Sequence, residues 1–97
     1  MAKAYWMVSY RKVTDPQRVA EYSKLAAPAI ANGGGRILAR GAAAFAHEAG
    51  LIERTVLTEF DSLQQAVSTF ESVGYQAALK ILGTAAERDF RIVEGVE

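Results

Sequence analysis

The chain has 97 residues, 51% of them hydrophobic, and its 11 lysine and arginine residues balance 11 aspartate and glutamate residues, which gives a formal net charge of zero. A neutral chain offers no basic surface for a phosphate backbone, which argues against nucleic-acid binding, and the absence of cysteine excludes disulfides, thiolate metal sites and cysteine nucleophiles. The apolar run near the N-terminus is far too short for a membrane span of about 20 residues, so we expect a cytoplasmic protein with no membrane contact. The length of the chain leads us to expect a single domain over residues 1–97.

The first predicted elements are a strand and a long helix. Residues 3–10 are aromatic and β-branched, without glycine or proline, and this composition is typical of a strand. The sequence Thr14-Asp15-Pro16 can cap and begin a helix, which we expect to run from Pro16 to Asn32. Pro28 lies inside this helix and is expected to kink or shorten its last turn.

A hairpin is predicted next. The glycines at positions 33–35 end the helix, because glycine enters the left-handed backbone region freely. A strand is expected at residues 36–40 and a second strand at residues 53–60, joined by an alanine-rich segment that contains the only histidine of the chain.

The last third of the chain predicts an interrupted helix and a final strand. Asp61 or Ser62 is expected to cap the helix, whose apolar residues recur at steps of three and four. Gly74 is expected to interrupt this helix, and a second helical piece then continues to Leu82. The final strand is predicted at residues 90–96.

The order strand, helix, strand, strand, helix, strand predicts an α+β, ferredoxin-like βαββαβ fold, in which a four-stranded antiparallel sheet carries both helices on one face. The first strand is apolar on both sides, because Ala4, Trp6 and Val8 point one way while Tyr5 and Met7 point the other. Two helices can cover only one face of the sheet. We therefore expect the chain to partner itself, as a homodimer in which two sheets pack face to face.

Four spaced motifs lie between residues 34 and 96: GGRILARG at residues 34–41, EFDSLQQA at 59–66, ESVGYQ at 71–76 and IVEGV at 92–96. Together they resemble the bacterial family named domain of unknown function 1330. That family looks like a member of the dimeric α/β-barrel superfamily, which also holds antibiotic-biosynthesis monooxygenases and related cofactor-free enzymes. The resemblance therefore implies a dimeric α/β barrel that uses no cofactor.

The resemblance also carries over individual residues. Members of the family commonly have a glycine-arginine strand, which this chain matches at Arg36 and at Arg40 with Gly41, and an aromatic residue that it matches at Tyr75. They also commonly have an arginine further along the last helix. This chain has no such arginine around residues 81–83.

Four residues are candidates for a ligand-binding site: Tyr10, Arg40, His47 and Tyr75. A phenol is costly to bury without a partner, so the two tyrosines are expected where one end of the ring is wet. Arg40 ends a predicted strand, where it could close one side of a cleft. His47 could act as a general base near neutral pH, although an exposed loop histidine without a task is the commoner case.

Other polar and aromatic residues have simpler interpretations. Arg36 and Arg40 are four apart on a strand and are expected on the same face, where they could bind a carboxylate or phosphate or, as we favour, pair with Glu53 and Glu59 on the next strand. A single histidine without cysteine does not supply a usual metal ligand set, so we expect no metal. Trp6, by contrast, is expected in the core, and so is Phe60.

The sequence thus favours a homodimer that binds a small organic molecule, in a cleft between the helices and the sheet or at the junction of two sheets. One alternative, implied by the resemblance, is a cofactor-independent monooxygenase or isomerase that acts on a small aromatic or polyketide-like compound. A second is a structural or stress-related dimer without a ligand. A cavity where Tyr10, Arg40 and either Tyr75 or His47 converge favours ligand binding, whereas a solid interior would exclude it.

Overall fold

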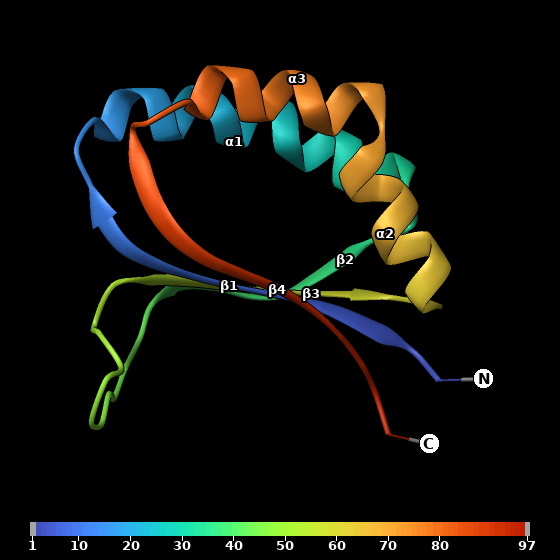
Figure 1. The fold of residues 1–97 in the computed structure, drawn as a ribbon, viewed down its shortest axis with the longest axis horizontal. Coiled ribbons are helices and arrows are strands. Elements are labelled where there is room, and N and C mark those ends of the chain that lie inside the picture. The colour runs from blue at the N-terminus through green and yellow to red at the C-terminus, as the bar shows by residue number, and fades with distance from the viewer. Residues whose placement is uncertain (1, 97) are drawn as a thin grey trace.

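The structure, a computed structural model, describes residues 2–96. In this part of the chain the secondary structure follows the predicted βαββαβ order, with the second helix divided into two pieces (Figure 1). The elements in chain order are β1 (Ala4–Val13), α1 (Pro16–Asn32), β2 (Arg36–Ala42), β3 (Arg54–Phe60), α2 (Leu63–Glu71), α3 (Val73–Leu82) and β4 (Ala86–Glu94).

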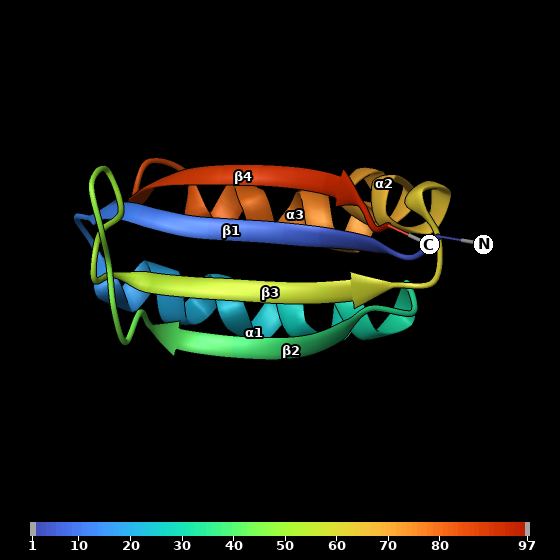
Figure 2. The ribbon, with the colours of Figure 1, turned by 90° about the horizontal axis from the view of Figure 1, so that it is seen from below.

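The strands form one antiparallel sheet in the order β2-β3-β1-β4. All the helices lie on one face of this sheet (Figure 1), and the other face is left uncovered (Figure 2). This arrangement confirms the predicted ferredoxin-like fold. We call the uncovered side the open face.

Helix α1 begins and ends where the sequence predicts. The Asp15 side chain accepts a hydrogen bond from the backbone N–H of Arg18, and Pro16 occupies the first turn. The helix continues past Pro28 to Asn32, so the expected shortening at that proline does not occur. Gly34 takes a φ of 87°, a backbone conformation that favours glycine, and this residue turns the chain toward β2.

The break between α2 and α3 lies at Ser72 and not at Gly74, which corrects the prediction. Ser72 has an extended backbone, its Oγ accepts from the N–H of Tyr75, and its hydroxyl donates to the carbonyl oxygen of Thr69. This serine therefore ends one helix and caps the next, while Gly74 lies inside α3. None of the helices in residues 2–96 is long and apolar enough to cross a membrane.

The strands reach further than hydrophobicity alone indicates. β1 continues beyond Tyr10 to Val13, and β4 begins at Ala86, because Val13 and Ala86 pair across the ladder. The predicted final strand at residues 90–96 therefore starts too late, and it also ends too late, since β4 stops at Glu94. Backbone pairing extends these strands through polar residues, which a search for apolar runs does not detect.

Trp6 is at the centre of the core. Its ring centroid lies 4.8 Å from that of Tyr75 and 5.1 Å from that of Phe60, and all these side chains are almost fully buried. The indole Nε1 donates to the carbonyl oxygen of Ala66 at 3.0 Å, so the polar end of the ring is satisfied. The expected core positions of Trp6 and Phe60 are confirmed.

Candidate functional site

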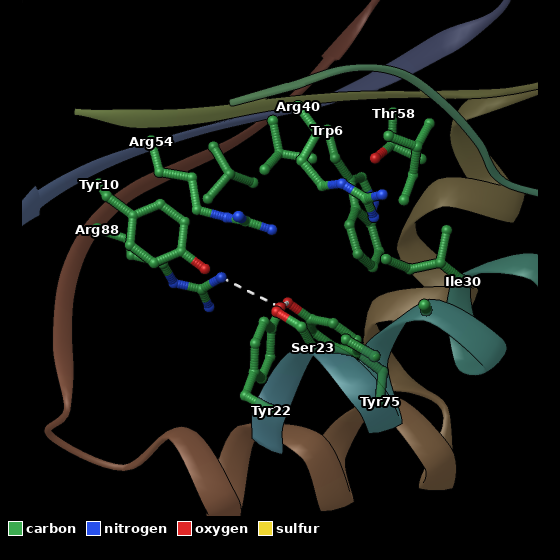
Figure 3. A pocket seen from close by; sticks show the side chains of 15 residues that line it. Trp6, Tyr10, Tyr22, Ser23, Ile30, Arg40, Arg54, Thr58, Tyr75 and Arg88 are labelled. Carbon is green, nitrogen blue, oxygen red and sulfur yellow. Dashed lines mark hydrogen bonds between the residues drawn. The ribbon is translucent and has the colours of Figure 1, made fainter. Parts of the chain in front are cut away.

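A cleft of about 40 Å³ lies between the sheet and α1, with Tyr75 of α3 contributing to its lining (Figure 3). Tyr22 and Ile30 of α1 line one wall, and Trp6 and Val8 of β1 line the other. Helix α1 packs closely against α3, whereas its backbone stands off from the strands and reaches them through side chains such as Tyr22 and Ile30. This spacing leaves room under α1 for side chains that project from the sheet. We call this space the cleft.

Three of the predicted site residues lie together in the cleft. Tyr10, Arg40 and Tyr75 all line it, although they come from β1, β2 and α3. Tyr10 and Tyr75 are almost fully buried, at 3% and 0% exposure, whereas Arg40 is exposed at the rim. The structure thus contains the convergence that the sequence left open.

His47 does not reach this cleft. It lies in the loop between β2 and β3, where its side chain is 78% exposed and its Nε2 lies 3.9 Å from a carboxylate oxygen of Glu48. It lines a separate hollow together with Phe45 and Tyr10. Across residues 2–96, no three His, Cys, Asp or Glu side chains are grouped closely enough to hold a metal ion.

Arg36 and Arg40 project to opposite faces of the sheet, which contradicts the prediction that they share one. Arg36 pairs with Glu59 in the ladder, but the register shifts around Leu38, so that Arg40 pairs with Val56. Leu38 is the extra residue of a β-bulge, and such a residue reverses the alternation of the side chains that follow it. The bulge therefore turns Arg40 into the cleft and leaves Arg36 on the open face.

The ion pair predicted for Arg36 is present on the open face. Its Nη2 lies 3.0 Å from Glu59 and 2.9 Å from Asp61, and these hydrogen bonds hold the pKa of both carboxyl groups below their usual range. Tyr5 donates to Glu59 at 3.2 Å, and this bond raises the pKa of the phenol. The pairing of Arg40 with Glu53 that we considered does not form, because the bulge turns Arg40 away.

A hydrogen-bonded chain of two tyrosines and an arginine borders the cleft (Figure 3). The hydroxyl oxygens of Tyr22 and Tyr75 are 2.6 Å apart, and Arg88 Nη1 donates to the Tyr22 oxygen at 3.1 Å. Burial, together with the neighbouring Tyr22, raises the pKa of Tyr75 far above its ordinary value, so this phenol stays protonated. The bond between the tyrosines uses one of their two hydroxyl hydrogens, and the hydrogen bonds of the described residues leave the other without an acceptor.

Two guanidinium groups flank the ring of Tyr10. Arg88 lies 5.5 Å and Arg54 lies 5.9 Å from the ring centroid, distances at which a cation interacts with the ring. Burial alone would lower the pKa of Arg88, but the oxygens of Tyr22 and Tyr75 outweigh this effect and raise it. Arg54 Nε is buried without a hydrogen-bond partner among the described residues. The cleft therefore holds a donor that its own walls do not satisfy.

Sequence reasoning missed Tyr22, Arg54 and Arg88 as site residues. The alternation of each strand could have indicated both arginines, because Arg54 lies two residues before Val56 and Arg88 lies two residues before Phe90, on the side that faces the helices. Both were overlooked because charged residues at strand ends are usually read as solvated. Tyr22 was considered only as one of the apolar residues that recur along its predicted helix, so its hydroxyl was not weighed as a polar group of the site.

Solved structures confirm the fold. A protein of unknown function from Rhodopseudomonas palustris matches 99% of this chain and 84% of its own with a TM-score of 0.77 and 14% identity. A dimeric ferredoxin-like protein of unknown function from Thermobifida fusca matches 96% of this chain and 91% of its own, with a TM-score of 0.65 and 16% identity. At these identities the likeness concerns the fold alone.

A candidate antibiotic biosynthesis monooxygenase from Caulobacter crescentus has a similar backbone. It covers 99% of this chain and 92% of its own, with a TM-score of 0.64 and 16% identity. No curated protein matches the chain. The sequence itself gives the family: the model of the domain of unknown function DUF1330 matches residues 3–96, a range that includes all four motifs. The chain therefore belongs to the DUF1330 family.

Proposed function

We propose that the chain forms a homodimer through the open face of its sheet and that each subunit binds one small organic molecule in the cleft. The observation that carries this proposal is the convergence of Tyr10, Arg40 and Tyr75 with two further arginines on a single hollow under α1. Side chains with this many hydrogen-bond donors commonly face water or a carboxylate when they have no ligand.

The composition of the cleft supports a small organic ligand. Apolar walls with a few placed polar groups are typical of such sites, and here Trp6, Val8 and Ile30 supply the apolar part. A cavity of about 40 Å³ holds only a compact group. A larger ligand would extend through the β2 edge, where Ile37 and Arg40 are exposed.

The open face supports a second copy as the partner. Met7 and Val93 are 49% and 45% exposed on this face, beside the half-buried Leu57 and Tyr5. Met7 lies on β1 between Leu57 of β3 and Arg91 of β4, so the apolar residues occupy the middle of the sheet. A sheet with one face already covered by helices commonly buries the other against a second sheet about 10 Å away.

The charged groups of the open face are compatible with burial in a dimer. Arg36 is paired with Glu59 and Asp61, and Arg91 is paired with Asp89 at 2.9 Å. The loop between β2 and β3 hangs on the same side of the sheet (Figure 1) and exposes Phe45 by 83%. This loop extends the apolar surface beyond the strands, where it could reach a second subunit.

A thermal-stability screen tests the ligand proposal. Small aromatic and keto-acid compounds should raise the melting temperature of the protein, because a ligand that binds only the folded state stabilises it by mass action. Tyr75→Phe should reduce the shift, since it removes a hydroxyl that borders the cleft. A dimer whose melting temperature no compound raises would instead support the structural or stress-related alternative.

A cofactor-independent monooxygenase or isomerase is the second candidate. The observation that favours it is the free hydroxyl hydrogen of the Tyr22–Tyr75 pair beside Arg88, because fixed donors next to a cation can stabilise an enolate or another oxyanion. The shared fold with the candidate monooxygenase from Caulobacter crescentus makes this chemistry worth testing. Compounds that stabilise the protein should be assayed for oxygen uptake, and stabilisation without turnover would reject an enzymatic role for those compounds.

A further inference from the structure

The cleft is lined by three arginines and by no acidic residue of the described chain. Arg40 comes from β2, Arg54 from β3 and Arg88 from β4, and all three project toward the helices. In Figure 3 the labelled side chains of Arg40 and Arg54 reach into the same space as Arg88. The cleft therefore concentrates positive charge in a chain whose formal net charge is zero.

Two arginines on the open face, Arg36 and Arg91, are neutralised. Arg36 contacts two carboxylates and Arg91 makes two hydrogen bonds to Asp89. Within residues 2–96, by contrast, none of the three cleft arginines has a carboxylate within ion-pair distance. Arg11 and Arg18 also make no ion pair with a described carboxylate, but both are exposed and lie outside the cleft. The cleft is therefore where three unpaired arginines gather.

The contacts of the cleft arginines do not compensate their charge. Arg88 donates to a phenol oxygen and lies over the rings of Tyr10, Tyr22 and Phe90, all of which are neutral groups. Arg54 stacks on Tyr10 and leaves its Nε buried without a partner. A buried cation is unfavourable unless an opposite charge or a full set of hydrogen bonds accompanies it.

We infer that the ligand of the cleft is a small carboxylate with an apolar body. This inference rests on the proposed binding function and specifies its ligand class. A carboxylate accepts paired hydrogen bonds from a guanidinium fork, so it can satisfy Arg54 and neutralise Arg88 together. Trp6 and Ile30 form an apolar wall for the body of the ligand, and the free hydroxyl hydrogen of the tyrosine pair supplies one more donor.

Matched probes separate charge from shape. Benzoate and its neutral amide, benzamide, are nearly the same size, and inorganic phosphate supplies charge without an apolar body. In calorimetric titrations of the wild-type protein we expect benzoate to bind roughly tenfold or more tightly than benzamide, because only benzoate is charged. We expect phosphate to bind more weakly than benzoate, because it leaves the apolar wall uncovered.

Arg54→Met tests the cation that lacks a partner. Methionine fills a similar volume without a charge, so this variant should unfold at a higher temperature than the wild type when no ligand is present. Its affinity for benzoate should be lower than that of the wild type by roughly tenfold or more. A purely structural arginine would give the opposite result, with lower stability and unchanged affinity. Lys24→Gln removes the same charge from the exposed surface of α1 and should leave both measurements unchanged.

Arg40→Gln provides a second variant in case Arg54→Met does not fold. Arg40 is exposed and makes no ion pair within the described residues, so the variant should fold normally and still bind benzoate several-fold more weakly. Equal binding of benzoate and benzamide would overturn the anion inference and leave the binding function intact. If neither compound binds at millimolar concentration, the inference and the proposed function both fail.

Discussion

The hydroxyl oxygens of Tyr22 and Tyr75 lie 2.6 Å apart, although 53 positions separate the two residues in the chain. The contact joins α1 to α3, and Arg88 of β4 donates to it from the sheet. A single buried polar link therefore connects both helices to the strand at the sheet edge. Because Tyr75 also borders the cleft, loss of its proton would affect stability and the lining of the cleft together.

Tyr75→Phe should change how stability depends on pH above 10. The pKa of Tyr75 is raised in the folded protein, so the folded state keeps a proton that the unfolded state loses near pH 10. As pH rises above 10, this difference lowers the free energy of unfolding of the wild type by up to about 1.4 kcal/mol per pH unit. The variant lacks this loss, but at pH 8 it should be less stable by about 1 kcal/mol for the missing hydrogen bond. Urea denaturation from pH 8 to 11 should show the gap closing, and parallel curves would contradict the prediction.

Met7→Lys should convert the proposed dimer into monomers at micromolar concentration. Met7 lies in the middle of the open face, where a buried lysine would have to lose its hydration without a partner. Sedimentation velocity measures the change directly. Val73→Lys is the matched control, because Val73 is 88% exposed on the helical side and should leave the assembly unchanged. A wild-type protein that is monomeric at these concentrations would remove the dimer proposal.

Gly35→Ala and Gly74→Ala should have opposite effects on the free energy of unfolding. A Cβ at Gly35 would lie 2.6 Å from Ile30 Cγ2 and 2.8 Å from the Phe60 ring, so we expect a loss of about 1–3 kcal/mol. A Cβ at Gly74 meets only Ala29, at 3.4 Å, so the gain in helix propensity should stabilise the protein by about 0.5–1 kcal/mol. Chemical denaturation measures the free energy of unfolding of both variants. Equal stability of the two variants would contradict the close packing around Gly35.

Arg36→Gln should lower stability at pH 7 but not at pH 2. Arg36 holds the pKa of Glu59 and of Asp61 below their usual range in the folded protein. Its contribution to the free energy of unfolding is therefore present above pH 4, which is about the pKa of these groups in the unfolded chain. It disappears as the pH falls through their lower pKa values in the folded protein. Arg36 and Asp61 are exposed and Glu59 is partly buried, so the effect should be small and should shrink in 1 M salt, where the Debye length is about 3 Å. Urea midpoints at both pH values, at one protein concentration, measure it.

Arg40→Gln is the control for that experiment. It removes the same charge four residues away, but Arg40 makes no ion pair with a described carboxylate. Its stability difference from the wild type should therefore be the same at both pH values. A pH-dependent difference for Arg40→Gln equal to that for Arg36→Gln would mean that general charge effects, and not the local pairs, set the acid response.

The sequence predicted the fold well because local signals were strong. Asp15 and Pro16 set the start of α1 and the glycines after Asn32 set its end, so the bounds of this helix are as predicted. The break at Ser72 was misplaced to Gly74, because a serine that caps one helix while ending another leaves no composition signal.

The site was predicted only in part. Tyr10, Arg40 and Tyr75 do converge, although Arg40 was placed on the wrong side of its strand relative to Arg36. A bulge depends on how two strands pair, and residue spacing in a single strand does not contain that information. For Arg88, the predicted final strand began only at Phe90, so the alternation that points Arg88 toward the helices was not extended back to it.

The unpaired Leu38 in β2 also bears on how this edge of the protein could have evolved. A chain that lacked this residue could restore regular pairing and still present Arg36 and Arg40 on the same two sides of the sheet. An added residue that joined the ladder would instead reverse the facing of every strand residue after it, and Arg40 would then turn out of the cleft. Insertions at this position, more than deletions, would therefore change the charge that lines the cleft.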